Sequence, residues 1–165
     1  WSMFKKIFIF SLSLVFIPSA WADTTEKMKQ QYDSFSNEAK QKAKDVFSNI
    51  GWEKITESTE HKIYMNYNYV KPDSYGQSEA WIKIVVYNDI TKDGLGVGDY
   101  IMVLNKYNCS DSTSKNLSYT EYNKTGNVIS SATSPSYQSY KQIIPETVGE
   151  SQLKWACFFS YVKSN

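Results

Sequence analysis

Two cysteines, Cys109 and Cys157, are the residues whose chemistry is simplest to predict from this sequence. An even pair of thiols in an oxidising compartment favours one disulfide. Closing the loop between them would stabilise a small domain by about 4 kcal/mol through the unfolded chain. The alternatives are two buried thiols, or a metal site that would need ligands beyond the single histidine, His61.

Other residues with chemical potential give weaker signals. A Ser-His-Asp triad would have to use His61, but no Gly-x-Ser-x-Gly motif accompanies it. The run at residues 94–98 contains three glycines, but a phosphate cradle opens a helix and this run lies between predicted strands. Asp89, Asp93 and Asp99 lack the ligand spacing of an EF-hand. We therefore predict no catalytic residue, no cofactor and no metal.

Tyrosine is abundant, with 13 copies in the chain. Its large apolar ring and polar tip suit protein interfaces, and they equally suit half-buried strands. Many tyrosines alternate along predicted strands or lie on loops, such as Tyr75, Tyr119, Tyr122, Tyr137 and Tyr140. Both interpretations stay open at this point.

The first residues indicate the compartment. Lys5 and Lys6 precede an apolar run at residues 7–17, and Ala20 and Ala22 have the spacing of a signal-peptidase site. The run is too short to span a bilayer as a helix. We predict a signal peptide over residues 1–22 that is removed on export. Asp23 stands where a lipoprotein needs cysteine, so a lipid anchor is not expected.

The remaining 143 residues fit one domain. Without the leader the chain has 16 lysines against 17 acidic residues, and no residue is arginine. Nucleic-acid binding needs a basic excess. Nucleic acid is therefore excluded as an expected partner.

Apolar residues from Met28 to Phe47 recur at steps of three and four. This spacing predicts one long helix over residues 25–48, with Gly51 as its stop. The apolar stripe would pack on the domain, on a partner helix or on a membrane surface. We treat residues 23–50 as a helical extension and residues 51–165 as the main domain.

Beyond Gly51 the sequence alternates between short aromatic or β-branched runs and turn residues. Strands are predicted over residues 62–70, 79–88, 100–108, 117–123, 127–131 and 137–144. Short turns without intervening helices indicate an antiparallel sheet of about six strands. In the second and third runs both alternating sets are apolar, so each face of the sheet should be covered. The candidate covers are the N-terminal helix, the C-terminal segment and another subunit.

The C-terminal segment begins with Thr147 and Glu150 at capping-box spacing. Leu153, Ala156 and Cys157 then share one helical face. We predict a shorter C-terminal helix, although residues 155–162 are rich enough in aromatics to form a final strand. The predicted fold class is therefore α+β: an antiparallel sheet, a long N-terminal helix, a shorter C-terminal helix and one disulfide.

Several motifs, in this order, resemble the surface-adhesin protein E family of Gram-negative bacteria. They are Trp52-Glu53-Lys54-Ile55, Ile63-Tyr64-Met65-Asn66, Ala80-Trp81-Ile82-Lys83-Ile84, Tyr107-Asn108-Cys109, Tyr119-Thr120-Glu121-Tyr122, Gly126-Asn127-Val128, and Ile143-Ile144-Pro145-Glu146-Thr147 before Trp155-Ala156-Cys157. The resemblance covers about residues 52–157.

The resemblance implies a small antiparallel sheet packed with a C-terminal helix, tied by the cysteine pair and often paired as a homodimer. It implies a non-enzymatic surface adhesin whose partners are host matrix or serum proteins such as vitronectin, laminin and plasminogen. The exported protein would lie in the periplasm or on the cell surface. An alternative is a periplasmic inhibitor or immunity protein that binds and blocks an enzyme.

Overall fold

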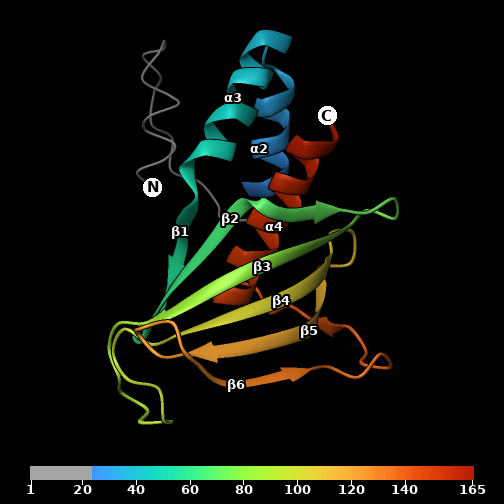
Figure 1. The fold of residues 1–165 in the computed structure, drawn as a ribbon. Helices are drawn as coiled ribbons and strands as arrows, with labels where there is room; N and C mark the ends of the chain where they lie inside the picture. The colour runs from blue at the N-terminus through green and yellow to red at the C-terminus, as the bar shows by residue number, and fades with distance from the viewer. Residues whose placement is uncertain (1–23) are drawn as a thin grey trace.

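The computed structural model describes residues 24–165, so the predicted signal peptide lies outside the described residues. The chain forms an antiparallel sheet with helices at both ends of the sequence (Figure 1). The helices are α2 (Thr24–Asp33), α3 (Asn37–Ile50) and α4 (Val148–Ser164). The strands are β1 (Trp52–Glu57), β2 (His61–Pro72), β3 (Gln77–Val86), β4 (Tyr100–Asn108), β5 (Thr113–Tyr122), β6 (Val128–Thr133) and β7 (Lys141–Gln142). The predicted α+β class with an antiparallel sheet is confirmed.

The sheet order is β1-β2-β3-β4-β5-β6, with each strand beside its sequence neighbour, and β7 also pairs with β5. Strand β1 was missing from the prediction, because its six residues, WEKITE, mix polar and apolar side chains without a clean pattern. The predicted strand at residues 137–144 is wrong except for Lys141–Gln142. Strand β6 already pairs with Ser118–Tyr122 of β5, and β7 pairs only with Thr113 and Ser114 at the other end of that strand.

The predicted single N-terminal helix is wrong in length, because the chain breaks between α2 and α3. Ser36 caps α3, and its hydroxyl accepts a hydrogen bond from the Ala39 amide at 3.2 Å. The break falls among Asp33, Ser34, Ser36 and Asn37. Their short polar side chains prefer helix caps and turns to helix interiors. Gly51 ends α3 with φ 80°, as predicted.

The C-terminal segment is a helix and not a strand, but it is not the shorter one. Helix α4 has 17 residues, against 10 for α2 and 14 for α3. Thr147 caps it, and the Glu150 amide donates to the Thr147 hydroxyl at 3.4 Å. Figure 1 shows α4 crossing the sheet, with α2 and α3 beside its C-terminal half.

One hydrophobic core lies between α4, the two N-terminal helices and one face of the sheet. Tyr32, Ala43 and Phe47 bring the N-terminal stripe into this core, so the stripe packs on the domain. Polar side chains join α4 to the sheet: the Ser78 hydroxyl donates to the Ala156 carbonyl at 3.2 Å, and the Tyr107 hydroxyl donates to Gln152 Oε1 at 3.0 Å. The other large core residues are Ile63, Met65, Val70, Ile82, Phe158, Phe159 and Val162.

Cys109 and Cys157 form the predicted disulfide, with Cα atoms 5.8 Å apart. Cys109 follows the end of β4, and Cys157 lies in the middle of α4. The bond therefore fastens the helix to the sheet at the edge of the core. None of the helices within residues 24–165 is both long and apolar enough to cross a bilayer.

Candidate functional site

The face of the sheet opposite α4 carries the candidate site, and we call it the outer face. Along β3, Ala80 and Ile82 point into the core, so the alternating Trp81, Lys83 and Val85 point to the outer face. Both helical segments cover the core face. The sequence predicted a cover for each face, but no helix of residues 24–165 covers the outer face.

A hollow of about 460 Å³ lies on the outer face. We call it the aromatic hollow, because five of its seven lining residues are Trp or Tyr. The lining residues are Trp52, Tyr69, Trp81, Lys83, Tyr100, Met102 and Tyr122. They come from five adjacent strands, β1 to β5, so the hollow crosses the sheet rather than following one strand.

Two pairs of stacked rings form the ends of the aromatic hollow. Trp52 and Tyr69 stack with ring centroids 5.7 Å apart and planes 28° apart. Tyr100 and Tyr122 stack at 4.8 Å and 11°, as direct partners on β4 and β5. Stacked aromatic pairs stabilise each other beyond the area that they bury. Both pairs are thus held as firm apolar walls.

Between these walls lie Trp81, Lys83 and Met102. Lys83 and Met102 are direct cross-strand partners, and the Lys83 ammonium lies over the Tyr100 ring, 4.4 Å from its centroid. This cation–π contact places a positive charge beside an apolar surface. No salt bridge to Lys83 exists among the described residues.

A bulge in β2 brings Tyr69 to the hollow. Met65 pairs with Ile82 and Val70 with Ala80, so residues 66–69 lie opposite Trp81 alone. The extra residues change which side chains point inward: Tyr67 is 6% exposed in the core, whereas Tyr69 is 50% exposed on the outer face. A regular strand would give Tyr67 and Tyr69 the same face. The bulge is therefore what makes Tyr69 available to stack on Trp52.

Polar contacts from two helices fix this bulge. Asn66 Oδ1 accepts from the Asn68 amide at 2.9 Å, and Asn68 Nδ2 donates to the Ser48 carbonyl of α3 at 2.8 Å. From α4, Lys163 Nζ donates to the carbonyls of Val70 at 2.7 Å and Asn68 at 3.3 Å. Burial lowers the pKa of Lys163.

Tyr67, below the bulge, packs on Phe47 and Phe159. Burial raises the pKa of Tyr67 to about 12, so its hydroxyl stays neutral over the physiological range. A neutral phenol suits this apolar surrounding, because an ionised group would lose its hydration there. The base of the bulge is thus part of the core, while its tip belongs to the hollow.

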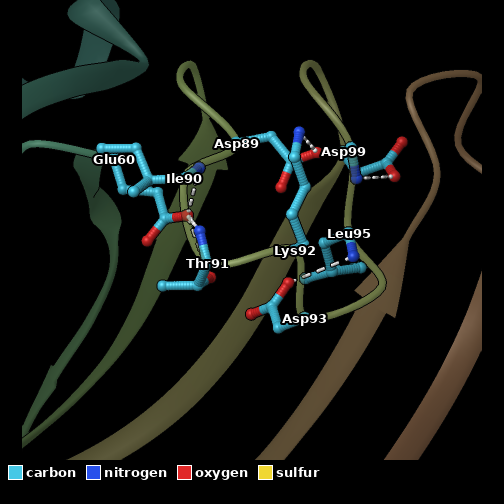
Figure 2. A network of polar contacts seen from close by, with 9 residues as sticks. Glu60, Asp89, Ile90, Thr91, Lys92, Asp93, Leu95 and Asp99 are labelled. Carbon is cyan, nitrogen blue, oxygen red and sulfur yellow. Dashed lines mark hydrogen bonds and ion pairs between the residues drawn. The ribbon is translucent and has the colours of Figure 1, made fainter.

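Glu60 organises the loop between β3 and β4 and was not identified from the sequence. It is only 9% exposed. Its Oε1 accepts hydrogen bonds from the Ile90 amide at 2.8 Å, the Thr91 amide at 2.7 Å and the Thr91 hydroxyl at 2.9 Å. Figure 2 shows the Glu60 carboxylate facing this loop backbone. The bonds, with the Thr91 amide foremost, lower the pKa of Glu60.

The aspartates of the same loop bind backbone amides or a lysine. Asp93 Oδ1 accepts from the Leu95 amide at 3.2 Å, and Asp99 accepts from the amides of Gly96 and Lys124, each at 2.8 Å. Asp89 pairs with Lys92 at 2.9 Å. Within the described part of the chain, no three or more His, Cys, Asp or Glu side chains come together in a group that could hold a metal ion.

His61 begins β2, at the edge of the loop network, and its amide donates to the Ser58 hydroxyl at 3.0 Å. The glycines at residues 94–98 lie in the β3–β4 loop and open no helix. Neither feature is brought into the aromatic hollow.

The tyrosines named from the sequence lie in different parts of the structure. Tyr122 lines the aromatic hollow, while Tyr75 and Tyr137 are 85% and 87% exposed on loops away from it. The Tyr140 hydroxyl donates to Gln77 Oε1 at 3.0 Å. Sequence analysis missed the hollow itself, because only the bulge and the strand register bring Trp52, Tyr69 and Trp81 together.

A second hollow of about 460 Å³ lies beside the disulfide, between α2, α4 and the segment before α4. Its charged groups are already paired, Lys29 with Glu26 at 2.7 Å and Lys154 with Glu150 at 2.9 Å. These pairs leave the second hollow without a free charge from those four residues. The aromatic hollow is accordingly the stronger candidate.

Comparison with known proteins gives one result. A family model described as surface-adhesin protein E matches residues 52–158. The match runs from the first residue of β1 into α4, so it includes every residue that lines the aromatic hollow. Comparisons with curated proteins and with solved structures give no match.

Proposed function

Because the chain belongs to the surface-adhesin protein E family, we propose that it is an exported adhesin whose outer face binds host matrix or serum proteins. The aromatic hollow carries this proposal. Large aromatic side chains dominate the binding energy of protein interfaces, and here they gather on a face that no helix of the described chain covers.

The proposal includes the route and the location of the protein. Residues 1–22 act as a leader, residues 23–50 as a helical extension, and the mature protein reaches the cell surface without a lipid anchor. The disulfide supports this placement, since such bonds persist in oxidising compartments. Protease treatment of intact cells that make the protein should degrade it. Protection in intact cells, with degradation after outer-membrane permeabilisation, would indicate a periplasmic protein instead.

The binding site is tested by truncating the centre of the hollow. The Trp81→Ala variant should bind immobilised laminin or vitronectin about tenfold more weakly or worse, because a central aromatic residue contributes a disproportionate share of interface energy. Surface plasmon resonance on both ligands measures the change. Trp81 is partly exposed on the outer face, so thermal melting should show that the variant remains folded.

Tyr137→Ala provides the matched control, since it removes an aromatic ring that is 87% exposed outside the hollow. It should bind both ligands as the unmodified protein does. Equal losses in the two variants, or no loss in Trp81→Ala while the unmodified protein binds, would show that the outer face is not the binding site. Failure of the unmodified protein to bind either ligand would contradict the proposed partners.

A further inference from the structure

All the polar side chains of the aromatic hollow can donate hydrogen bonds, and only its three tyrosine hydroxyls can also accept them. Trp and Lys side chains can only donate, Tyr hydroxyls can donate or accept, and the lining includes no carboxylate and no carboxamide. Among the described residues, the ring N–H of Trp52 and Trp81 and the hydroxyls of Tyr69, Tyr100 and Tyr122 form no hydrogen bond within the chain. A ligand seated here must therefore supply acceptors.

A proline-rich segment supplies acceptors without matching donors. Proline has no backbone N–H, and in the polyproline II conformation the carbonyls point outward without internal hydrogen bonds. Proline rings also pack flat on aromatic side chains, and aromatic-lined grooves are the known receptors for such segments. Sugar hydroxyls, by contrast, donate as well as accept, and only the three tyrosine oxygens of this lining can accept from them.

The dimensions agree with a short segment. The hollow reaches from β1 to β5, four strand spacings of about 4.8 Å each, which is about 19 Å. Polyproline II rises about 3.1 Å per residue. About six residues would therefore span the whole hollow, from Trp52 on β1 to Tyr122 on β5.

Charge adds a further requirement. Lys83 has no carboxylate partner among the described residues and lies within the hollow, above Tyr100. A nearby lysine of the outer face, Lys62, likewise lies over a ring, that of Tyr87, at 5.0 Å. An occupant with an acidic residue would neutralise Lys83. A second copy of the same face would instead bring further donors and a second lysine, so it is a poor match.

We propose that the aromatic hollow binds a proline-rich segment of a partner protein, in the polyproline II conformation, with an acidic residue that pairs with Lys83. This inference rests on the proposed function and specifies the ligand of that same site. The walls hold proline rings, the Trp and Tyr donors bind the carbonyls, and the Lys83 ammonium binds the carboxylate.

Fluorescence polarisation with dye-labelled peptides tests the proposal on the mature protein. The probe is a peptide of six prolines interrupted by one glutamate. In the glutamine peptide, glutamine replaces the glutamate. In the alanine peptide, alanine replaces every second proline. The glutamate peptide should bind best, the glutamine peptide several-fold more weakly, and the alanine peptide about tenfold more weakly. Equal binding of the glutamate and alanine peptides would overturn the proposal.

Two variants locate the interaction. Trp81→Ala should weaken all the proline peptides about tenfold, whereas Lys83→Met should weaken only the glutamate peptide, to the level of the glutamine peptide. Tyr137→Ala should leave all of them unchanged. Binding of the glutamate peptide that is insensitive to both Trp81→Ala and Lys83→Met would place the peptide elsewhere and overturn the inference.

Other outcomes separate this inference from the proposed function. If no peptide binds but Trp81→Ala still abolishes laminin or vitronectin binding, the ligand class is wrong and the adhesin site stands. Stronger binding of sulfated oligosaccharides than of peptides, abolished by Trp81→Ala, would assign the hollow to glycans. A dimer of the unmodified protein in light scattering that becomes a monomer in Trp81→Ala would assign it to self-association.

Discussion

At the residue scale, the side chains that have no polar partner within the described chain differ in role from those whose polar groups are already bonded. Lys83 has no acidic partner among the described residues, and the aromatic groups around it have no hydrogen-bond partners there, so the hollow presents unused donors. Glu60 shows the opposite situation. One of its oxygens accepts three hydrogen bonds from the β3–β4 loop. Its role is therefore to hold that loop rather than to bind a ligand.

Acid should release that loop. The pKa of Glu60 is lower in the folded protein than in the unfolded chain, so the unfolded state binds a proton first as pH falls. The stabilisation by Glu60 is complete above about pH 4.5 and is lost as pH falls through the lowered pKa. As pH falls through the pKa of Glu60, hydrogen exchange at the Ile90 and Thr91 amides should become faster relative to exchange at amides of the central strands.

The Glu60→Gln variant is the control for this pH dependence. Its side chain keeps an acceptor but cannot ionise, so exchange at Ile90 and Thr91 should be faster at neutral pH and should no longer change specifically between pH 3 and 5. An unchanged acid response in Glu60→Gln would show that another group titrates.

At the scale of elements, the bulge in β2 connects the core to the outer face. Its base, Tyr67, packs against α3 and α4, while its tip, Tyr69, stacks on Trp52 of β1. Lys163 near the end of α4 holds the bulge through two carbonyls. The geometry of one wall of the hollow thus depends on a helix on the opposite side of the sheet.

Removing the Lys163 donor should therefore affect both stability and binding. Lys163→Met leaves the Asn68 and Val70 carbonyls without this partner, and we expect the free energy of unfolding to fall by about 1 kcal/mol. Ligand binding at the outer face should weaken as Tyr69 loses its fixed position. Urea unfolding and the binding assay measure the two effects.

Lys71→Met is the matched variant, because it removes the same charge from an exposed position on β2. It should change the stability by only a few tenths of a kcal/mol. Similar losses in Lys71→Met and Lys163→Met would mean that charge, and not the bonds to the bulge, explains the effect.

At the scale of the whole molecule, the helices and the sheet form one core that leaves the outer face free. The disulfide joins the end of β4 to the middle of α4, and the polar bonds from Ser78 and Tyr107 to α4 lie on the same side of the sheet. The helical side of the molecule is thus the stabilising side, and the aromatic side is available for binding.

Loss of the disulfide should lower stability without removing the site. For the Cys109→Ser, Cys157→Ser double variant we expect the free energy of unfolding to fall by about 4 kcal/mol, because the unfolded chain regains the freedom of a loop with a sequence separation of 48. Urea unfolding measures this change. Under conditions where the variant is folded, it should still bind through Trp81.

The unmodified protein, denatured without reductant, should show no reactive thiol at Cys109 or Cys157. A loss of stability well below 1 kcal/mol in the double variant would contradict the loop-closure argument. A folded variant that no longer binds ligand would show that the bond also shapes the outer face.

The sequence by itself determined the β-rich α+β class, the cysteine pair and the helical character of both ends, because these follow from local periodicity, turn residues and residue parity. The order of its motifs indicated the family. The cap at Ser36 was a local signal for the helix break, but the apolar repeat continues across it and favoured one helix. Strand β1 was missed because its sequence pattern is irregular. Apolar residues on both sides of β3 showed only that each face should be covered.

Tertiary structure alone decided which face was left open and what lined it. The bulge changes the direction of Tyr69 by inserting residues opposite Trp81, and no local pattern encodes that register. Helix α4 binds the bulge with a residue 95 positions from Asn68 along the chain. Long-range packing sets such contacts, so the binding face becomes visible only when five strands stand side by side.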